Sequence, residues 1–136
     1  MLKFALIALG GAVGSVLRYL LHNSVQRWVD TTWPLSTGAA FPFGTLAVNV
    51  LGCLAIGVLA GLFADPWPLR EEYRIGLTVG VLGGFTTFST FGIDAFGLTN
   101  AGHGRLAIVY MLMSCLLGFA AVLVGYRVVT RAYAML

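Results

Sequence analysis

The uncharged stretches of this chain limit its fold more than any other feature. Residues 43–64, 75–93 and 106–126 carry no charge, and each run is about as long as a helix that crosses a membrane. A shorter uncharged run covers residues 4–17. Only 10% of the residues are charged and 59% are hydrophobic, and a soluble core this apolar would lack the polar surface to cover itself. The composition therefore excludes a disordered chain and an ordinary soluble enzyme, and it predicts an integral membrane protein.

Four membrane-spanning helices fit this pattern, so residues 1–136 are expected to form a single transmembrane domain of the all-α class. Pro42 suits the first turn of the second helix, because its missing N–H would have no partner there. Arg18 interrupts the first span, and it either extends to the lipid headgroups or faces a wet cavity. The expected spans are about 2–28, 42–64, 73–98 and 106–126.

An even number of spans places both ends of the chain on the same side of the membrane. The basic residues are divided unevenly between the two sides, but the bias is weak. It permits insertion in both orientations, and it equally permits a single orientation with cytoplasmic termini. Because the cations are scattered, nucleic acid is not an expected partner. The basic residues on the side of the termini are Lys3, Arg70, Arg74, Arg127 and Arg131. Those on the opposite side are Arg27 and Arg105, to which Arg18 is added if the first span ends before it.

The third span contains an interruption at its centre. Gly83 and Gly84 are adjacent, and the hydroxyl-rich run 86–90 follows them. Such a segment weakens a helix, and at membrane depth it is tolerated only where it is buried in protein or lines a wet cavity. We therefore predict a broken helix. A break frees backbone carbonyls, which bind a hard cation, and exposes a half-helix N-terminus, which favours an anion.

Small and polar residues recur at intervals of four along three spans, so each set shares one helix face. We interpret the glycines in these stripes as sites of close helix packing. Asn49 and Ser114 differ, because a polar side chain in mid-span needs partners; they either serve packing or line a polar path. The stripes are Gly10, Gly14, Arg18 and His22; Thr45, Asn49, Cys53, Gly57 and Gly61; and Tyr110, Ser114 and Gly118.

Two phenylalanines of the interrupted span, Phe88 and Phe91, alternate with hydroxyl residues. They serve either packing or contact with an anion, since the edge of a phenyl ring carries positive partial charge. Asp94, near the end of this span, is interpreted as an interfacial or capping carboxylate, and His22 and His103 as interfacial residues. The sequence contains no nucleophile–base pair, nucleotide loop or carboxylate pair, so it does not predict an enzyme.

The run GGFTTFSTF, residues 83–91, resembles the broken-helix motif of the Fluc fluoride channel family, also called CrcB-type fluoride exporters. Two other segments agree with this resemblance: GAVGSVLRYLL at 11–21 is similar to the family's first helix, and FPFGTLAVNVLGC at 41–53 is similar to its second. Tyr110 and Ser114 fall where the fourth helix of that family carries polar residues. The resemblance extends over essentially the whole chain.

The resemblance implies an antiparallel, dual-topology homodimer with two pores in the bilayer of a bacterial cell membrane, with one four-helix channel domain per subunit. It implies fluoride as the transported ion and a structural sodium ion (Na⁺) at the dimer interface. The sodium ligands would be the backbone carbonyls of Gly83 and Thr86, although the adjacent repeats leave Gly84 and Thr87 open as an alternative. Arg18 would lie near a vestibule. The ion-pathway residues implied are Asn49, Phe88, Phe91, Thr45, Thr90, Tyr110 and Ser114.

The predicted function is passive, fluoride-selective efflux that reduces fluoride toxicity in the cytoplasm. The residues by themselves indicate an anion path built from neutral donors and ring edges, whereas fluoride comes from the resemblance. A small dual-topology multidrug or cation transporter shares the length and the weak charge bias, but it needs a membrane carboxylate. A non-transporting membrane subunit, whose stripes serve packing only, is a third alternative.

Overall fold

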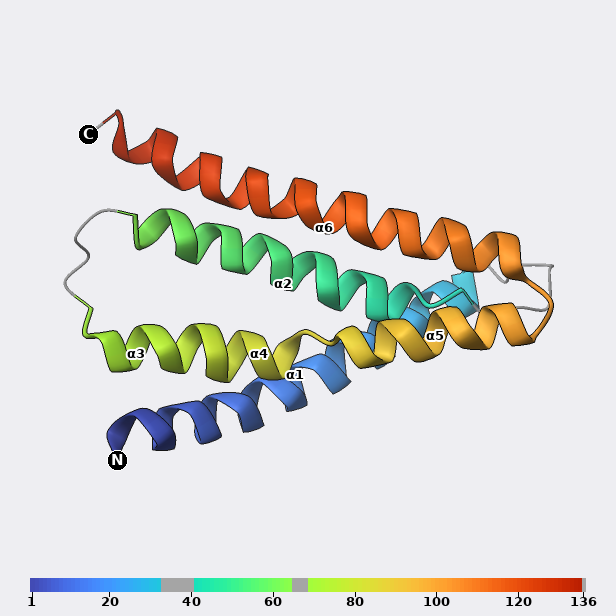
Figure 1. Cartoon of the computed structure of the whole chain (residues 1–136), viewed down its shortest axis with the longest axis horizontal. Coiled ribbons are helices and arrows are strands. Elements are labelled where there is room, and N and C mark those ends of the chain that lie inside the picture. Colours follow the sequence, from blue (N-terminus) through green and yellow to red (C-terminus); the bar gives the residue numbers. More distant parts are fainter. Residues whose placement is uncertain (33–40, 65–68, 136) are drawn as a thin grey trace.

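Four helical spans lie side by side along the long axis of the molecule, and both chain ends lie at the same end (Figure 1). The computed structural model describes residues 1–32, 41–64 and 69–135. All four spans are long and apolar enough to cross a membrane, which confirms the expected number. The spans are α1 (Leu2–Thr32), α2 (Phe43–Leu62), the third span Glu71–Asn100 and α6 (Gly104–Tyr133).

The third span consists of four consecutive helical segments. A short α3 (Glu71–Ile75) leads into the π-helix η1 (Gly76–Leu82), and α4 (Gly83–Phe85) continues it. Two residues without helical conformation follow, and α5 (Phe88–Asn100) then completes the span. The predicted interruption is therefore present, and it lies near the middle of the bundle (Figure 1).

The helix boundaries follow from local chemistry. Pro42 immediately precedes α2, as expected. Gly102 connects α5 to α6 with a φ of +83°, which glycine adopts without the steric cost of a side chain. The N–H of His103 donates to the carbonyl of Leu98 at 2.9 Å and so satisfies one of the last carbonyls of α5. Residues 65–68, expected to end the second span, lie outside the described residues.

Glycines bring the helices close together, as the stripes in the sequence predict. A Cβ atom added to Gly10 would lie 2.8 Å from the carbonyl oxygen of Gly76, so α1 lies against the backbone of η1. A Cβ atom at Gly57 would likewise meet the carbonyl of Val122 in α6. Side chains at these positions would keep the helices apart. These stripe glycines therefore serve helix packing.

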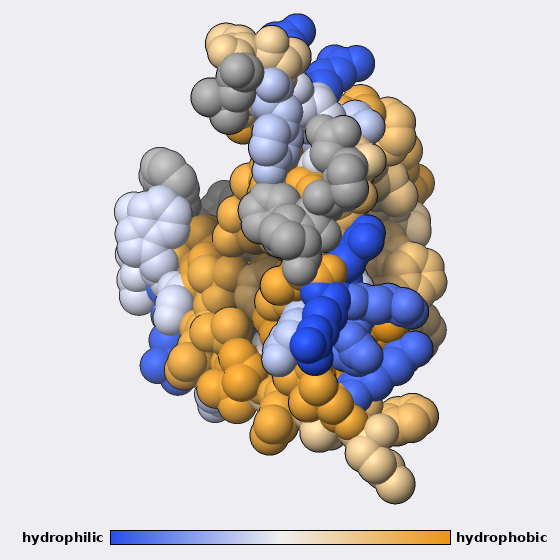
Figure 2. Space-filling model, turned by 90° about the vertical axis from the view of Figure 1, so that its left-hand side faces the viewer, coloured by the Kyte–Doolittle hydropathy of each residue, from blue (hydrophilic) through white to orange (hydrophobic). Residues whose placement is uncertain are grey.

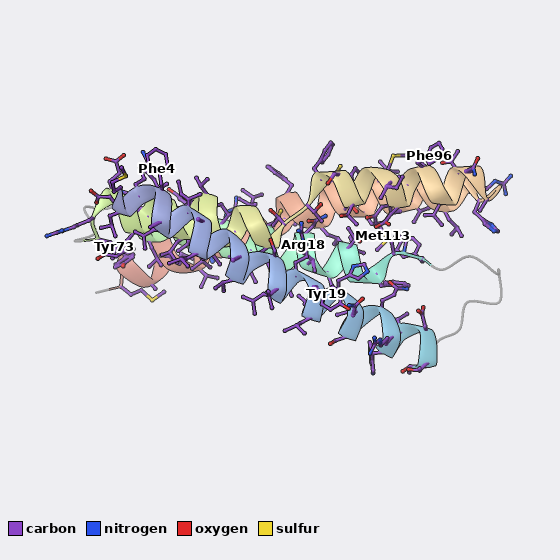
Figure 3. All side chains as sticks on the ribbon, turned by 90° about the horizontal axis from the view of Figure 1, so that it is seen from below. Phe4, Arg18, Tyr19, Tyr73, Phe96 and Met113 are labelled. Carbon is purple, nitrogen blue, oxygen red and sulfur yellow. The ribbon has the colours of Figure 1, made fainter. Side chains whose placement is uncertain are left out.

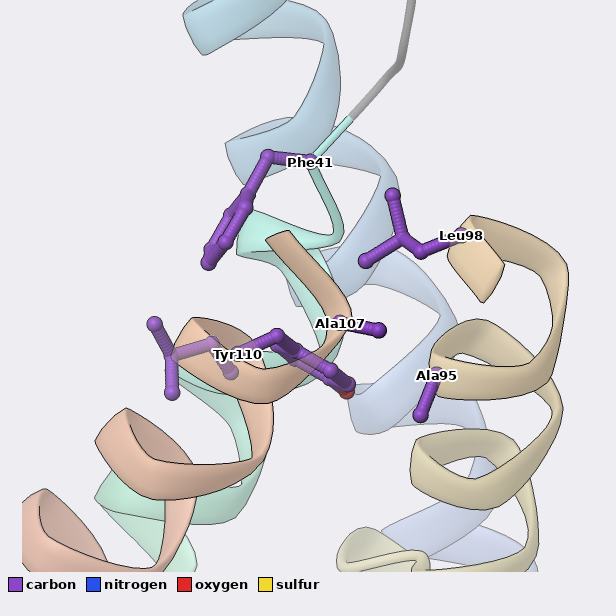
Figure 4. Packing of buried hydrophobic residues seen from close by; sticks show 6 residues of the cluster. Phe41, Ala95, Leu98, Ala107 and Tyr110 are labelled. Atoms are coloured by element: carbon purple, nitrogen blue, oxygen red, sulfur yellow. The ribbon is translucent and has the colours of Figure 1, made fainter. Parts of the chain in front are cut away.

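The buried hydrophobic core is small and lies near the end of the molecule where α5 joins α6 (Figure 4). Tyr110 is fully buried within it. Many other large apolar side chains face outward, as helices surrounded by lipid require. Phe4 and Phe96 point away from the bundle near its two ends (Figure 3). The buried cluster consists of Phe41, Leu46, Ala95, Leu98, Ala107 and Tyr110.

Polar side chains gather at the end of the bundle that holds both termini. Figure 2 looks onto the end that holds both termini and shows hydrophilic residues there, with hydrophobic residues around them. At this end the guanidinium carbon of Arg74 lies 4.3 Å above the centre of the Phe63 ring. Apolar flanks with polar ends match the layers of a bilayer, so the outer surface agrees with the four predicted spans.

Candidate functional site

The break in the third span consists of two residues in extended conformation. Thr86 has φ −83° and ψ 160°, and Thr87 has φ −153° and ψ 120°. The Thr87 Oγ1 accepts the N–H of Thr90 at 3.2 Å and thereby caps α5. The first amides of a helix lack intrahelical partners, and the helix dipole favours negative charge at that end. The sequence thus places a helix N-terminus at mid-depth in the bundle.

Asn49, on α2, holds this break in place. Its Nδ2 donates to the carbonyl of Thr87 at 3.0 Å, and its Oδ1 accepts the N–H of Thr87 at 2.9 Å. One side chain therefore satisfies both backbone groups of an extended residue, which are costly to leave unpaired away from water. The role of Asn49 in the ion pathway stays a prediction, and its contacts in the structure support the backbone of Thr87.

Two backbone carbonyls of the break lose their usual helical partners. In a continuous helix the carbonyl of Gly83 would accept the N–H of Thr87, and that of Thr86 would accept the N–H of Thr90. Here the N–H of Thr87 donates to Asn49, and the N–H of Thr90 donates to the Thr87 side chain. The two carbonyls that lose these amides are the pair predicted from the sequence as cation ligands.

A positively charged side chain lies beside one of these carbonyls. The Nη1 atom of Arg18 is 3.4 Å from the carbonyl oxygen of Thr86, a long hydrogen bond. Arg18 therefore lies at the break, in the middle part of the bundle, rather than at one of its ends (Figure 3). Of the alternative pair of cation ligands, Gly84 and Thr87, the Thr87 carbonyl accepts a hydrogen bond from Asn49.

The two predicted pathway phenylalanines have different surroundings. Phe88 projects from the bundle and is 85% exposed. Phe91 packs against Tyr110, with 5.3 Å between ring centroids, and borders the buried core. The rings of Phe88 and Phe91 are themselves 5.4 Å apart and tilted by 34°. The Phe91 ring is thus packed against its neighbours, whereas the Phe88 ring lies on the outer surface of the bundle.

A cavity of about 410 Å³ lies beside the break and is lined by Asn49, Phe88, Phe91 and Ser114. Among the described residues that line it, none carries a charge, and hydroxyl groups are interspersed with apolar side chains. The Ser114 Oγ is buried and has no hydrogen-bond partner within the described part of the chain. This hydroxyl is therefore available as a donor to a group in the cavity.

A second cavity, of about 350 Å³, contains the other predicted residues that are close to the break. Arg18, Thr45 and Thr90 line it, and Thr87 lines both cavities. Tyr110 lines neither, because it is fully buried in the core. The structure therefore divides six of the seven predicted pathway residues between two cavities that share Thr87, and it places the seventh, Tyr110, in the core.

The capping interpretation of Asp94 is wrong. Asp94 lies in the middle of α5, and its Oδ2 accepts hydrogen bonds from Thr45 at 2.6 Å and from the Tyr110 hydroxyl at 3.5 Å. It is therefore not a helix cap but part of a polar cluster between α2, α5 and α6, while its interfacial position stays a prediction. Its position three residues after Phe91 places it on the same helix face, and this spacing could have identified it.

These features define a multi-pass membrane protein, which in bacteria lies in the plasma membrane, with a polar interruption enclosed by its own helices. Broken helices of this kind bind ions in membrane proteins through freed carbonyls and half-helix N-termini. A family model described as CrcB-like protein, Camphor Resistance (CrcB), matches residues 5–126. The chain belongs to this CrcB-like family.

Related proteins align over almost the whole chain. A protein of Nitrobacter winogradskyi named fluoride-specific ion channel FluC is 45% identical over 123 residues, 90% of this chain and 91% of its own length. A protein of the same name from Rhizobium johnstonii is 44% identical over 128 residues, which is 94% of this chain and 96% of its own length. One from Chloroflexus aurantiacus is 44% identical over 119 residues, which is 88% of each chain. The family predicted from the GGFTTFSTF run is thus confirmed.

Proposed function

We infer that this protein is a fluoride channel through which fluoride leaves the cell passively. This efflux lowers the fluoride concentration in the cytoplasm and so reduces fluoride toxicity. The observation that carries the inference is the break held by Asn49 and Thr87, in a chain whose relatives are named fluoride-specific ion channels. Passive conduction requires no covalent step, which agrees with the prediction that the chain is not an enzyme.

The physical requirement for such a channel is a set of donors that replaces the hydration shell of fluoride. The first cavity offers uncharged groups with positive partial charge. These are the Ser114 hydroxyl, which has no partner among the described residues, and the ring edges of Phe88 and Phe91. Thr45 and Thr90 continue the proposed path on the other side of the break, and Tyr110, which lines neither cavity, contacts Asp94 through its hydroxyl at 3.5 Å. Arg18 supplies positive charge in the second cavity, which we propose as a vestibule that attracts the anion.

An antiparallel homodimer explains the exposure of Phe88. Its ring and the exposed Cys115 both line the first cavity, so in a single subunit this mostly apolar space, with the Asn49 amide and several hydroxyl groups in its wall, opens toward the lipid. Lipid cannot satisfy polar groups, and a second copy packed over this flank can. The weak bias of basic residues between the two sides permits the two copies to insert in opposite orientations.

A structural sodium ion fits the carbonyls of Gly83 and Thr86. Their usual amide partners are engaged elsewhere, and oxygen atoms of unwound helices are suitable sodium ligands. Contributions from two subunits would supply a cage of four such oxygens. The nearby Arg18 must then move from its 3.4 Å contact with Thr86, because the guanidinium and the cation repel each other.

A multidrug or cation transporter is not favoured. Such a transporter needs a carboxylate that binds substrate and proton in turn. Asp94 is the one carboxylate within α5, and its Oδ2 accepts hydrogen bonds from two neighbouring side chains, Thr45 and Tyr110. The names of the relatives also support a channel.

Efflux from liposomes that contain the purified protein tests the proposed function. Vesicles loaded with potassium fluoride or potassium chloride are diluted into an impermeant salt, and ion-selective electrodes record release. We expect fluoride release only after the potassium ionophore valinomycin is added, because passive anion flow needs a compensating cation. Equal chloride release, or fluoride release without the ionophore, would contradict a passive fluoride-selective channel.

A further inference from the structure

The first turn of α2 is held by a side chain from another helix. Pro42, which precedes α2, provides no side-chain hydrogen bond to it. Gln26 of α1 does so instead: its Oε1 accepts the N–H of Gly44 at 3.1 Å, and its Nε2 donates to the carbonyl of Phe41 at 3.2 Å. The first amides of a helix have no partner within that helix, so Gln26 satisfies a group that would otherwise be unpaired.

The orientation of the Gln26 amide is determined by its partners. The N–H of Gly44 only donates and the carbonyl of Phe41 only accepts, so the oxygen and the nitrogen of the amide cannot be exchanged. The second hydrogen of Nε2 is donated to the Oδ1 of Asp30 at 3.0 Å. Both amide hydrogens and the amide oxygen are therefore engaged, which fixes this side chain between α1 and the start of α2.

Backbone packing brings the same part of α1 against α2. A Cβ atom added to Gly44 would lie 2.6 Å from the carbonyl oxygen of His22, so no side chain fits between the two backbones. His22 and Gln26 are four residues apart and share one face of α1. Arg18, four residues before His22, lies on this face too and contacts the carbonyl of Thr86. One face of α1 therefore contacts both the start of α2 and the break.

The four spans form two closely packed pairs of helices. α1 packs on η1 and α4, with Gly10 at the contact, and α2 packs on α6, with Gly57 at the contact. The two pairs meet mainly where α1 contacts α2 and where α5 contacts α6, whereas α2 itself contacts the third span only slightly. The hydrogen bonds between Asn49 and Thr87 thus join one pair to the other. Their geometry depends on how the two pairs are placed against each other.

We propose that Gln26 is a positioning residue of the fluoride path, which it serves without lining either cavity. Its amide fixes the start of α2 on α1, and Asn49 follows Gly44 by five residues, about 7.5 Å along the helix axis. The amide thereby sets the height at which Asn49 meets the backbone of Thr87. Without it, Asn49 shifts, the break loses its fixed position and fluoride conduction falls. This proposal rests on the proposed fluoride conduction.

Fluoride efflux from liposomes, measured per amount of folded protein, tests this role. Gln26→Met retains the length of the side chain but removes its hydrogen bonds, and efflux is expected to fall at least about threefold. Asn23→Leu is the matched control, because Asn23 is another carboxamide of α1 and makes no side-chain hydrogen bond to the described residues. It should conduct normally. Wild-type efflux per folded protein in Gln26→Met would restrict Gln26 to helix stability and overturn the proposal.

Two further variants separate the contacts of Gln26. Asp30→Ala removes only the exposed partner of the amide and keeps both backbone hydrogen bonds, so its efflux should equal that of the wild type. Gln26→Glu keeps an acceptor for the N–H of Gly44 but has no amide hydrogen for the carbonyl of Phe41, so it should also lower efflux. If Gln26→Met does not fold, normal efflux in Gln26→Glu overturns the proposal. Asp30→Ala with efflux as low as that of the Gln26 variants would do so too.

An NMR measurement follows Asn49 itself and needs no fluoride flux. In protein labelled with ¹⁵N in its asparagine side chains and held in lipid membranes, Asn23→Leu and Asn100→Ala assign the signal of Asn49, the remaining asparagine. We expect Gln26→Met to shift or broaden this signal, because the hydrogen bond from Nδ2 to the carbonyl of Thr87 changes. Asn23→Leu should leave it in place.

The two measurements distinguish failure of this proposal from failure of the proposed function. An unchanged Asn49 signal in Gln26→Met would overturn the positioning role even if efflux fell. A shifted signal in a protein whose wild type releases no fluoride would instead contradict the proposed function and leave the positioning of Asn49 standing.

Discussion

At the scale of single residues, the side chains near the break have two separate tasks. Asn49 uses both ends of its carboxamide on the backbone of Thr87, whereas the Ser114 hydroxyl has no partner among the described residues. The sequence places both residues on polar stripes but does not distinguish them. Periodicity defines the helix face of a residue, and the partner depends on which backbone approaches that face.

This difference predicts a loss of stability for one substitution that removes a polar group and almost no change for another. Asn49→Leu leaves the N–H and carbonyl of Thr87 unpaired at about 1–3 kcal/mol each, so it should lower both the unfolding temperature and fluoride efflux. Ser114→Ala should lower efflux but leave the unfolding temperature nearly unchanged. Thermal unfolding followed by size-exclusion chromatography, with efflux on the same samples, measures both. Equal stability of the two variants would contradict the supporting role of Asn49.

The exposed ring of Phe88 leads to a second prediction. Phe88→Ile retains an apolar side chain but removes the positive ring edge, so a fluoride ion would lose hydration without compensation. We expect a folded protein whose efflux falls at least about tenfold, equivalent to about 1.4 kcal/mol in the barrier. Phe96→Ile, also on α5 and 63% exposed, is the matched control and should conduct normally. Normal efflux in Phe88→Ile would show that its ring only packs.

The same comparison applies to Phe91→Ile. Phe91 contacts Tyr110 and the core, so its replacement should cost some stability as well as most of the efflux. A loss of stability without a loss of efflux in this variant would restrict Phe91 to packing.

At the scale of the helices, the sequence predicts the break but not the π-helix that precedes it. Two adjacent glycines followed by hydroxyl residues weaken any helix, so the interruption at residues 86–87 is expected from local chemistry. The π-helix η1 lies against α1 through Gly10, Gly76 and Gly80. A contact between distant segments leaves no local pattern in the chain.

The packing of α4 on α1 predicts the effect of a methyl group at the break. A Cβ atom at Gly84 would lie 2.5 Å from the carbonyl oxygen of Gly11, whereas nothing lies within 4 Å of a Cβ atom at Gly97. Gly84→Ala should therefore destabilise the protein by about 1–3 kcal/mol through overpacking. Gly97→Ala, the control, should be neutral or slightly stabilising because alanine favours a helix. A stabilising Gly84→Ala, measured by thermal unfolding, would show that this contact is absent.

At the scale of the whole molecule, the proposed antiparallel homodimer predicts that each end of the chain is found on both sides of the membrane. After Cys53 and Cys115 are replaced by alanine, a single cysteine at Lys3 should react with a membrane-impermeant maleimide from both sides of the membrane. About half of the copies should react from each side, and chemical crosslinking should give dimers. Complete labelling from one side alone would exclude opposite orientations.

The proposed sodium site predicts a dependence on the ion but not on its gradient. Carbonyls at a fixed break hold the ion in place, so fluoride efflux should be the same whichever side has more sodium. Replacement of all sodium by a large organic cation should instead lower the stability of the dimer, measured by size-exclusion chromatography. A fluoride flux that reverses with the sodium gradient would contradict a structural ion.

The sequence by itself determined the membrane class, the number of spans, the position of the break and the family. These features depend on composition, on the length of apolar runs and on local weakness of a helix. Each of these properties is determined by residues that are close together in the sequence. Only the tertiary structure decided which groups meet: Asn49 with Thr87, Asp94 with Thr45 and Tyr110, and His22 with Thr45. Each pair joins different helices, and the relative rotation and height of two helices depend on the packing of all four. No local pattern contains that information.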